Sequence, residues 1–153
     1  MKINISILFS MKNLRIDLIL SNKIKVYMTL FEECVEALSD DFSLLSEEKE
    51  KEVLNIFYKY PFEYGNINKL KEGIVTLKFD KLIRLIEKKV KSSEVYVLAD
   101  ISGVPIFKTN LFLALEKIDD ISALSTKVFL LGDGYLAQIM SQTPPLDIVA
   151  LSS

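Results

Sequence analysis

The stretch VYVLADISGVPIFKTN, from Val95 to Asn110, decides the fold of this chain. Its first part is a short apolar run of β-branched and aromatic residues, which predicts a strand covered on both faces. DISG then supplies turn-forming residues, and IFK predicts a short extended piece. Thr109 or Asn110 is suited to cap the next segment, LFLALEKI, which is apolar nearly all round and predicts a helix in the core.

A second buried strand and a hairpin are predicted further along the chain. KVFLL repeats the apolar pattern from Lys127 to Leu131, and GDG supplies the turn that would return YLAQIM beside it as an antiparallel strand. The tail after Pro144 and Pro145 predicts one edge strand. The segment EYGNINKLKEG, residues 63–73, is rich in turn residues and predicts a long, partly ordered loop.

Three helices are predicted before the first buried strand. MTLFEECVEALSDD carries the capping-box pair Thr29 and Glu32, followed by an apolar stripe. SEEKEKEVLNIFYKYPF opens with an acidic turn and stops at Pro61, and FDKLIRLIEKKVKSS has Asp80 as its expected N-cap. The predicted fold class is therefore α/β or α+β. We expect a single small domain, with N-terminal helices packed on a small central mixed sheet and a C-terminal hairpin.

The composition excludes several kinds of catalytic site. The 153 residues include no histidine and one cysteine, so Ser/His, Cys/His and histidine-based zinc arrangements cannot form within the chain. General acid and base chemistry would fall to carboxylates, lysine or tyrosine. Cys34 cannot form an internal disulfide, and its place on the apolar stripe of the first helix predicts a core residue.

Charge divides the chain near Met28. Residues 1–27 contain five basic residues and one acid, whereas residues 28–153 contain fourteen basic and twenty acidic residues. Three interpretations of the first segment remain open: a signal peptide, an additional edge strand or two, or an extension ahead of a true start at Met28. We favour the third, because a well-capped helix begins directly after that methionine. Residues 28–153 would then form the domain.

Three segments are candidate sites. Asp100 follows a strand, where α/β proteins place functional groups, but a turn explains it more simply and no nucleophile-elbow or phosphate-loop motif surrounds it. Asp119 and Asp120 end the predicted helix LFLALEKIDD, where they oppose the helix dipole, and such unfavourable charge indicates a partner. YKYPFEYG, residues 58–65, has four aromatic residues, which either fold back on the core or serve as protein-binding anchors.

Three longer segments together resemble a known family. MTLFEECVEALSDDFSLL, YPFEYGNI and VYVLADISGVPIFKTNLFLALEKIDDISALSTKVFLL are similar to CdiI-type immunity proteins of bacterial contact-dependent growth inhibition systems. The resemblance implies a non-enzymatic cytoplasmic protein without a cofactor. It would bind the C-terminal toxin domain of a cognate CdiA-like effector one to one and block its active site. Such toxins are often nucleases, some acting on tRNA, and an acidic inhibitor suits their basic clefts.

Interface residues cannot be carried over from the resemblance, so charge and aromatic character select them. The candidates for toxin binding are Glu63, Tyr64, Asp100, Asp119 and Asp120. No membrane contact is expected, and direct nucleic-acid binding is disfavoured because the domain is acidic and its basic helix face lacks interleaved aromatics. The alternatives are a plain protein-binding adaptor or a small magnesium-dependent hydrolase or nuclease using Asp100, Asp119 and Asp133. The last alternative requires these carboxylates to lie close together.

Overall fold

A single antiparallel sheet organises the chain. The computed structural model describes residues 29–89, 92–140 and 147–151. Its main sheet has seven strands in the order β1-β6-β5-β7-β8-β9-β4. The strands, in chain order, are β1 (Phe42–Leu44), β4 (Ile74–Leu77), β5 (Glu94–Ala99), β6 (Phe107–Asn110), β7 (Lys127–Gly132), β8 (Tyr135–Met140) and β9 (Asp147–Leu151). The predicted extension, residues 1–27, lies outside the described residues.

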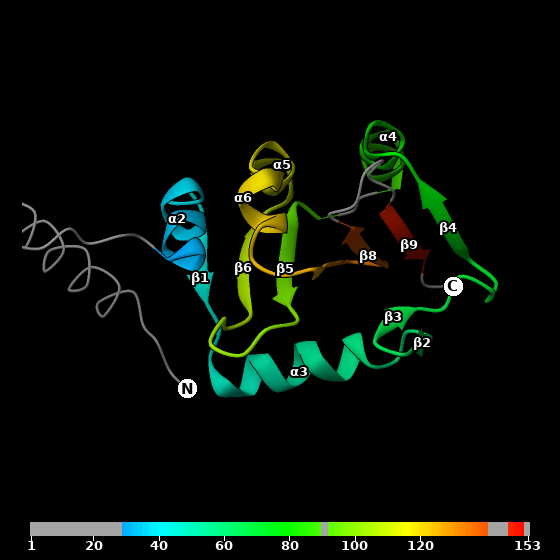
Figure 1. Ribbon diagram of the computed structural model, residues 1–153, viewed down its shortest axis with the longest axis horizontal. Helices are drawn as coiled ribbons and strands as arrows, with labels where there is room; N and C mark the ends of the chain where they lie inside the picture. Colours follow the sequence, from blue (N-terminus) through cyan, green and yellow to red (C-terminus); the bar gives the residue numbers. More distant parts are fainter. Residues whose placement is uncertain (1–28, 90–91, 141–146, 152–153) are drawn as a thin grey trace, which may run out of the picture.

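Helices cover both faces of this sheet (Figure 1). One face carries α2 (Leu30–Ala37), α4 (Phe79–Lys89), α5 (Leu111–Glu116) and α6 (Ile118–Ser122). The other face carries α3 (Glu47–Phe57) and a small hairpin of β2 (Phe62–Glu63) and β3 (Asn66–Ile67). The predicted α+β class, with N-terminal helices packed on a central sheet, is confirmed. We expected a mixed sheet, but every described strand pair is antiparallel.

The strongest sequence patterns form the centre of the sheet. The run EVYVLA is β5, and KVFLL lies in β7, which forms the predicted hairpin with β8 through the GDG turn. Val95 and Val97 are buried on one face of β5 and Leu98 on the other, so this strand is covered on both faces as predicted. The strand expected after Pro145 also exists. However, β9 is not an edge strand, because β4 pairs with its outer side.

Local capping explains where several helices begin. The Thr29 hydroxyl accepts a hydrogen bond from the Glu32 amide at 3.1 Å, as the capping-box pattern predicts. Asn110, rather than Thr109, caps α5 by accepting from the Phe112 and Leu113 amides. The expected N-cap Asp80 is wrong, since α4 begins at Phe79 and Asp80 lies in its first turn.

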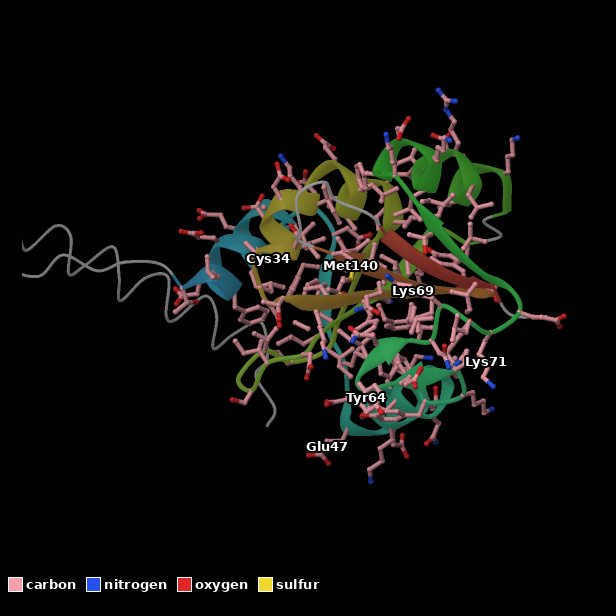
Figure 2. The ribbon with its side chains drawn as sticks, turned by 45° about the vertical axis from the view of Figure 1, so that its right-hand side comes forward. Cys34, Glu47, Tyr64, Lys69, Lys71 and Met140 are labelled. Atoms are coloured by element: carbon pink, nitrogen blue, oxygen red, sulfur yellow. The ribbon has the colours of Figure 1, made fainter. Side chains whose placement is uncertain are left out.

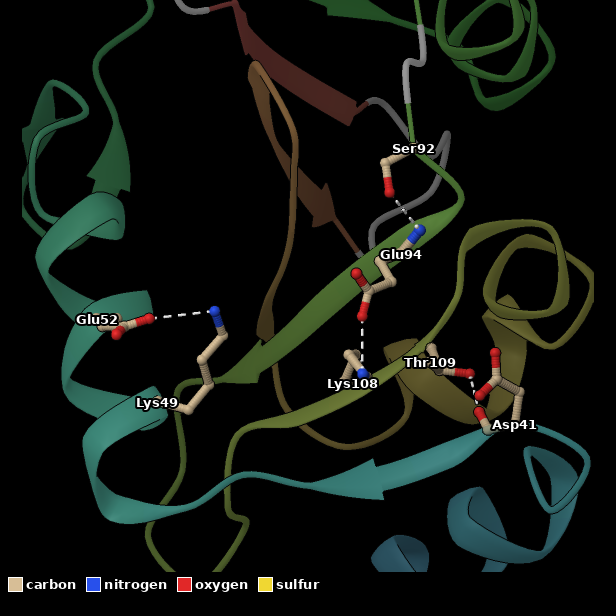
Figure 3. A network of polar contacts seen from close by, with 7 residues as sticks. All are labelled: Asp41, Lys49, Glu52, Ser92, Glu94, Lys108 and Thr109. Carbon is tan, nitrogen blue, oxygen red and sulfur yellow. Dashed lines mark hydrogen bonds and ion pairs between the residues drawn. The ribbon is translucent and has the colours of Figure 1, made fainter.

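Polar contacts fasten the β1 edge of the sheet (Figure 3). The buried Thr109 hydroxyl donates to the backbone carbonyl of Asp41, which connects β6 to the segment before β1. The Lys108 ammonium pairs with the Glu94 carboxylate at 2.7 Å across β6 and β5. The Thr109 bond supports the short β1 strand, whose three residues pair with β6, while the Lys108–Glu94 pair joins β6 to β5.

The predicted helix LFLALEKIDD is two helices. It breaks at Lys117, and α6 starts at Ile118, so Asp119 and Asp120 lie in the first turn of α6. Negative charge is favourable at that end of a helix dipole. The expectation that these two acids oppose the dipole is therefore wrong, and local charge gives no separate indication of a partner.

Candidate functional site

A tight hairpin stands where a long loop was predicted. In β2 and β3, Phe62 pairs with Ile67 and Glu63 with Asn66, which leaves a two-residue turn. Both turn residues have positive φ, 54° at Tyr64 and 75° at Gly65, as in a type I′ turn. Asparagine and glycine are the usual residues there, and a tyrosine in this conformation costs on the order of 1 kcal/mol. This strained turn displays the Tyr64 side chain, which is 90% exposed.

Two side chains of the main sheet hold this hairpin in place. Gln138 of β8 is fully buried; its Oε1 accepts from the Ile67 amide at 2.9 Å and its Nε2 donates to Asn66 Oδ1 at 2.8 Å. The Lys127 ammonium at the start of β7 donates to the Tyr64 carbonyl at 3.3 Å. Tyr64 is therefore an exposed aromatic side chain on a fixed backbone.

Sequence reasoning missed both supports. Gln138 is the single polar residue inside the apolar run YLAQIM, and that position was the available signal, because a buried amide must find hydrogen-bond partners. Nothing in the sequence links Lys127 to a hairpin some sixty residues earlier. Glu63 is exposed in β2 and Tyr64 follows it at the turn, on the α3 side of the sheet, where Figure 2 also places Glu47.

An apolar hollow of about 420 Å³ lies between α3, this hairpin and the end of β5. Its volume falls within the range typical of ligand pockets. The described residues that line it are Leu54, Phe57, Tyr58, Phe62, Gly65, Leu98, Ala99, Asp100, Ile106 and Phe129. Asp100 is the one charged residue among them.

Asp100 is held by its backbone. Its amide donates to the Lys127 carbonyl at 2.9 Å, and its carbonyl accepts from the Ser125 hydroxyl at 3.0 Å. Within the described ranges, no residue donates a hydrogen bond to its carboxylate or forms an ion pair with it. The predicted turn exists at residues 100–103, but the Asp100 carboxylate does not bond its own backbone and is exposed.

A second, shallow hollow begins on the other side of Asp100. Asp119 of α6 lines it together with Asp100, and the remaining lining residues are Ile101, Ser122, Ala123, Ser125 and Thr126. The structure therefore brings Tyr64, Asp100 and Asp119 to one end of the sheet. We call the region formed by Tyr58, Glu63, Tyr64, Asp100 and Asp119 the candidate surface.

Asp120 has a different environment. It lies in the same helix turn as Asp119, but its negative charge influences the pKa of the buried Cys34 thiol of α2. Burial, reinforced by the negative charge of Asp120, raises the pKa of the Cys34 thiol to about 12. Cys34 is the core residue that the sequence predicted, and the raised pKa keeps the thiol in its unreactive protonated form.

The three carboxylates of the alternative magnesium site are not assembled. Asp133 lies in the turn after β7, whereas the Asp100 backbone bonds to Lys127 at the start of that strand. A strand of this length separates the two positions by about 17 Å. Across the described part of the chain, no three aspartate, glutamate or cysteine side chains are grouped so that they could hold a metal ion.

Charge is distributed unevenly along the molecule. Residues 29–57, which form α2, β1 and α3, contain nine acidic and two basic residues, whereas residues 58–91 contain nine basic and four acidic residues. In Figure 1, α2 and α4 lie at opposite ends of the sheet. Basic residues of the second group, such as Lys69 and Lys71, are labelled in Figure 2. Acidic residues therefore predominate in the segment that forms α2, β1 and α3, and basic residues in the segment that follows it.

The chain is an α+β domain that carries a fixed aromatic hairpin and exposed carboxylates at one end of its sheet. The family description CdiI immunity protein EcoliA0-like matches residues 28–145. The chain belongs to this family of immunity proteins, which neutralise toxins in contact-dependent growth inhibition. The resemblance seen in three sequence segments is confirmed. No curated protein matches the chain.

The helices give one further fact relevant to location. None of those in the described residues has the length and apolar character required to cross a membrane.

Proposed function

We propose that this chain binds the C-terminal toxin domain of a cognate CdiA-like effector in the cytoplasm, one to one, and blocks its active site without catalysing a reaction. The observation that carries this proposal is Tyr64, an exposed aromatic residue on a strained and firmly supported turn. Tyrosine is over-represented among the anchors of protein interfaces. A preorganised anchor loses little conformational entropy on binding.

The charge of the candidate surface supports a basic partner. Glu63, Asp100 and Asp119 contribute carboxylates there, and none of the described residues that line the two hollows next to Asp100 is basic. Carboxylates can occupy the place of phosphates in a nuclease cleft and attract a basic partner from a distance. A nuclease toxin, including one that acts on tRNA, has such a cleft. We place the toxin-binding domain within residues 28–153, with Asp120 as a peripheral contact.

The test is to express the variable C-terminal domain of the large effector gene next to this gene. The full chain is expected to restore growth of cells that produce this domain and to co-purify with it one to one. Absence of both rescue and complex would contradict the proposal. The toxin's own activity is then assayed on tRNA and DNA with and without the chain, which tests whether the chain blocks a nuclease.

Charge reversal at α6 tests the electrostatic part of the proposal. Replacing both Asp119 and Asp120 with Lys is expected to slow association about tenfold at low salt and to reduce its salt dependence, because long-range attraction acts mainly on the association rate. Stopped-flow or surface binding kinetics measure this effect. Asp133→Lys, at the opposite end of the sheet, is the positional control for a charge reversal of half that size. Unchanged rates in the double variant would remove α6 from the interface.

A further inference from the structure

We propose that the apolar hollow next to Asp100 receives the side chain of an arginine from the toxin, with its guanidinium on the Asp100 carboxylate and its alkyl stem against aromatic rings. This inference rests on the proposed toxin-binding function and names the partner chemistry of that site. Three features of the hollow support it: its rings, its charge and the fixed position of its walls.

The wall of the hollow is aromatic. The ring centroid of Phe57 lies 4.7 Å from that of Phe62 and 5.0 Å from that of Phe129, so the three rings form one packed group. Tyr58 extends this group at the rim and is 70% exposed. Aromatic faces attract cations, and long basic side chains pack their methylene stems on apolar surface. The hollow is therefore suited to a long side chain with a cationic end.

The charge of the hollow comes from Asp100. Its carboxylate makes no hydrogen bond or ion pair with another residue of the described ranges, so both oxygens remain available to a ligand. The nearby Lys127 ammonium donates to the Tyr64 carbonyl. Asp119, in the adjoining hollow, adds a second negative charge on the far side of Asp100. A cationic group entering from the toxin would therefore find a carboxylate that has no partner among the described residues.

Arginine fits this arrangement better than lysine. Its planar guanidinium stacks on aromatic rings and binds both oxygens of a carboxylate, whereas the lysine ammonium is a compact and strongly hydrated charge. Arginine is also enriched among the residues that dominate binding energy. In a nucleic-acid-binding toxin, such an arginine would otherwise contact substrate phosphate.

The walls of the hollow are fixed before binding. Gln138 and Lys127 hold the hairpin, and the Asp100 backbone is bonded to Lys127 and Ser125. Gly65 at the hairpin turn has φ 75°, a backbone conformation that other residues rarely adopt. The hollow is therefore part of the folded chain and does not require the toxin to create it.

The first experiment measures toxin affinity in the full chain. Asp100→Asn is expected to weaken binding about 10- to 100-fold, the effect of losing one charge-assisted contact. Asp133→Asn removes the same charge at the opposite end of the sheet and is expected to change affinity less than about twofold. Tyr58→Ala is expected to weaken binding about fivefold. Ile56→Ala, in the last turn of the helix that Tyr58 caps but lining a different hollow, should leave affinity unchanged.

The second experiment uses the chain without toxin. N-acetyl-arginine N-methylamide is titrated while the amide signals of Leu98, Asp100 and Ile106 are followed by NMR. We expect shifts that saturate, that disappear in Asp100→Asn and that the neutral isostere N-acetyl-citrulline N-methylamide does not produce.

The outcomes separate this inference from the proposed function. If wild-type chain binds toxin and Asp100→Asn binds it equally well, the arginine inference is overturned whatever the titration shows. If the toxin does not bind the wild-type chain, the proposed function fails and the titration alone decides about the hollow. Identical shifts with the citrulline compound would then overturn the arginine inference.

Discussion

The two faces of the sheet are covered to different extents. On one face, α2, α4, α5 and α6 close over a continuous core that includes Phe107 and Leu130. On the other face, α3 and the β2–β3 hairpin cover a smaller core around Phe129, and hollows border α3. The candidate surface includes the open face and the adjoining end of the sheet. The closed face holds the larger core, whereas most of the candidate surface lies on the open face and only Asp119 comes from the closed side. Substitutions on each face test how far stability and recognition are divided between them.

The largest effect is expected in the closed core. Phe107 is fully buried and packs against Phe31 and Phe42 with centroid distances of 6.2 and 5.0 Å. Phe107→Ala should lower the free energy of unfolding by about 3–5 kcal/mol, measured by urea denaturation. Phe112→Ala, at a residue that is 51% exposed, should have little effect. If the folded molecules of the Phe107→Ala variant bound toxin more weakly than the wild type, the closed core would contribute to recognition as well as to stability.

Among the described residues, two buried polar side chains provide a matched pair across the sheet. Gln138 supports the open-face hairpin, and Thr109 anchors the β1 edge. Gln138→Leu and Thr109→Val should each lower the free energy of unfolding by about 1–3 kcal/mol, because each leaves a backbone partner without its hydrogen bond.

Only the Gln138 variant is expected to weaken toxin binding and to speed hydrogen exchange at the Ile67 amide. Denaturation, binding and exchange measurements on both variants distinguish the two roles. Equal loss of toxin affinity in the two variants would show that general destabilisation of the fold is sufficient to weaken binding, without a specific role for the hairpin.

Alkaline pH tests how well the closed face excludes solvent. The Cys34 pKa of about 12 is raised chiefly by burial, and burial also raises the Tyr135 pKa. The folded chain holds these protons at pH values where the unfolded chain releases them. The stability that Cys34 contributes is therefore complete below about pH 9 and is lost as pH rises toward 12, by about 1.4 kcal/mol per pH unit.

Urea unfolding between about pH 8 and pH 11 measures this slope. Cys34→Ala should give a shallower slope than the wild type, while the contribution of Tyr135 remains. In the wild type, thiol reagents should label Cys34 only on unfolding. Rapid labelling of the native chain at neutral pH would contradict a closed core.

The smallest effect on stability, with the opposite sign, is expected at Tyr64. Asparagine tolerates the left-handed conformation better than tyrosine, so Tyr64→Asn should raise the free energy of unfolding by about 0.5–1 kcal/mol. The same variant should weaken toxin binding at least about tenfold, because it removes the exposed anchor. Denaturation and binding titration measure the two effects. A lower free energy of unfolding together with normal toxin binding would contradict both the backbone strain and the anchor role assigned to Tyr64.

Local patterns predicted the centre of the fold. The apolar runs of β5 and β7, the GDG turn and the caps at Thr29 and Asn110 depend on neighbouring residues, and each was recognisable in the sequence. The strands β1 and β4 were missed, since they contain three and four residues and exist through pairing with distant strands.

The site was only partly predictable for the same reason. Tyr64, Asp100 and Asp119 were selected by residue type, but their arrangement depends on tertiary packing. The hairpin turn was missed because tyrosine replaces the asparagine that usually marks a type I′ turn. The break at Lys117 was hidden in an apolar helical pattern, and it changes the position of Asp119 and Asp120 from the end of one helix to the start of another.

The order of the strands has a consequence for biosynthesis. In the sheet, β4 pairs only with β9 among the described strands, so that Ile74 lies opposite Ala150. Because the ribosome makes β4 long before β9, β4 cannot take its place in the sheet while the intervening residues are being translated. The nascent chain must therefore keep β4 unpaired until β9 has emerged. The seven-stranded sheet should therefore be complete only after a delay following the synthesis of β4.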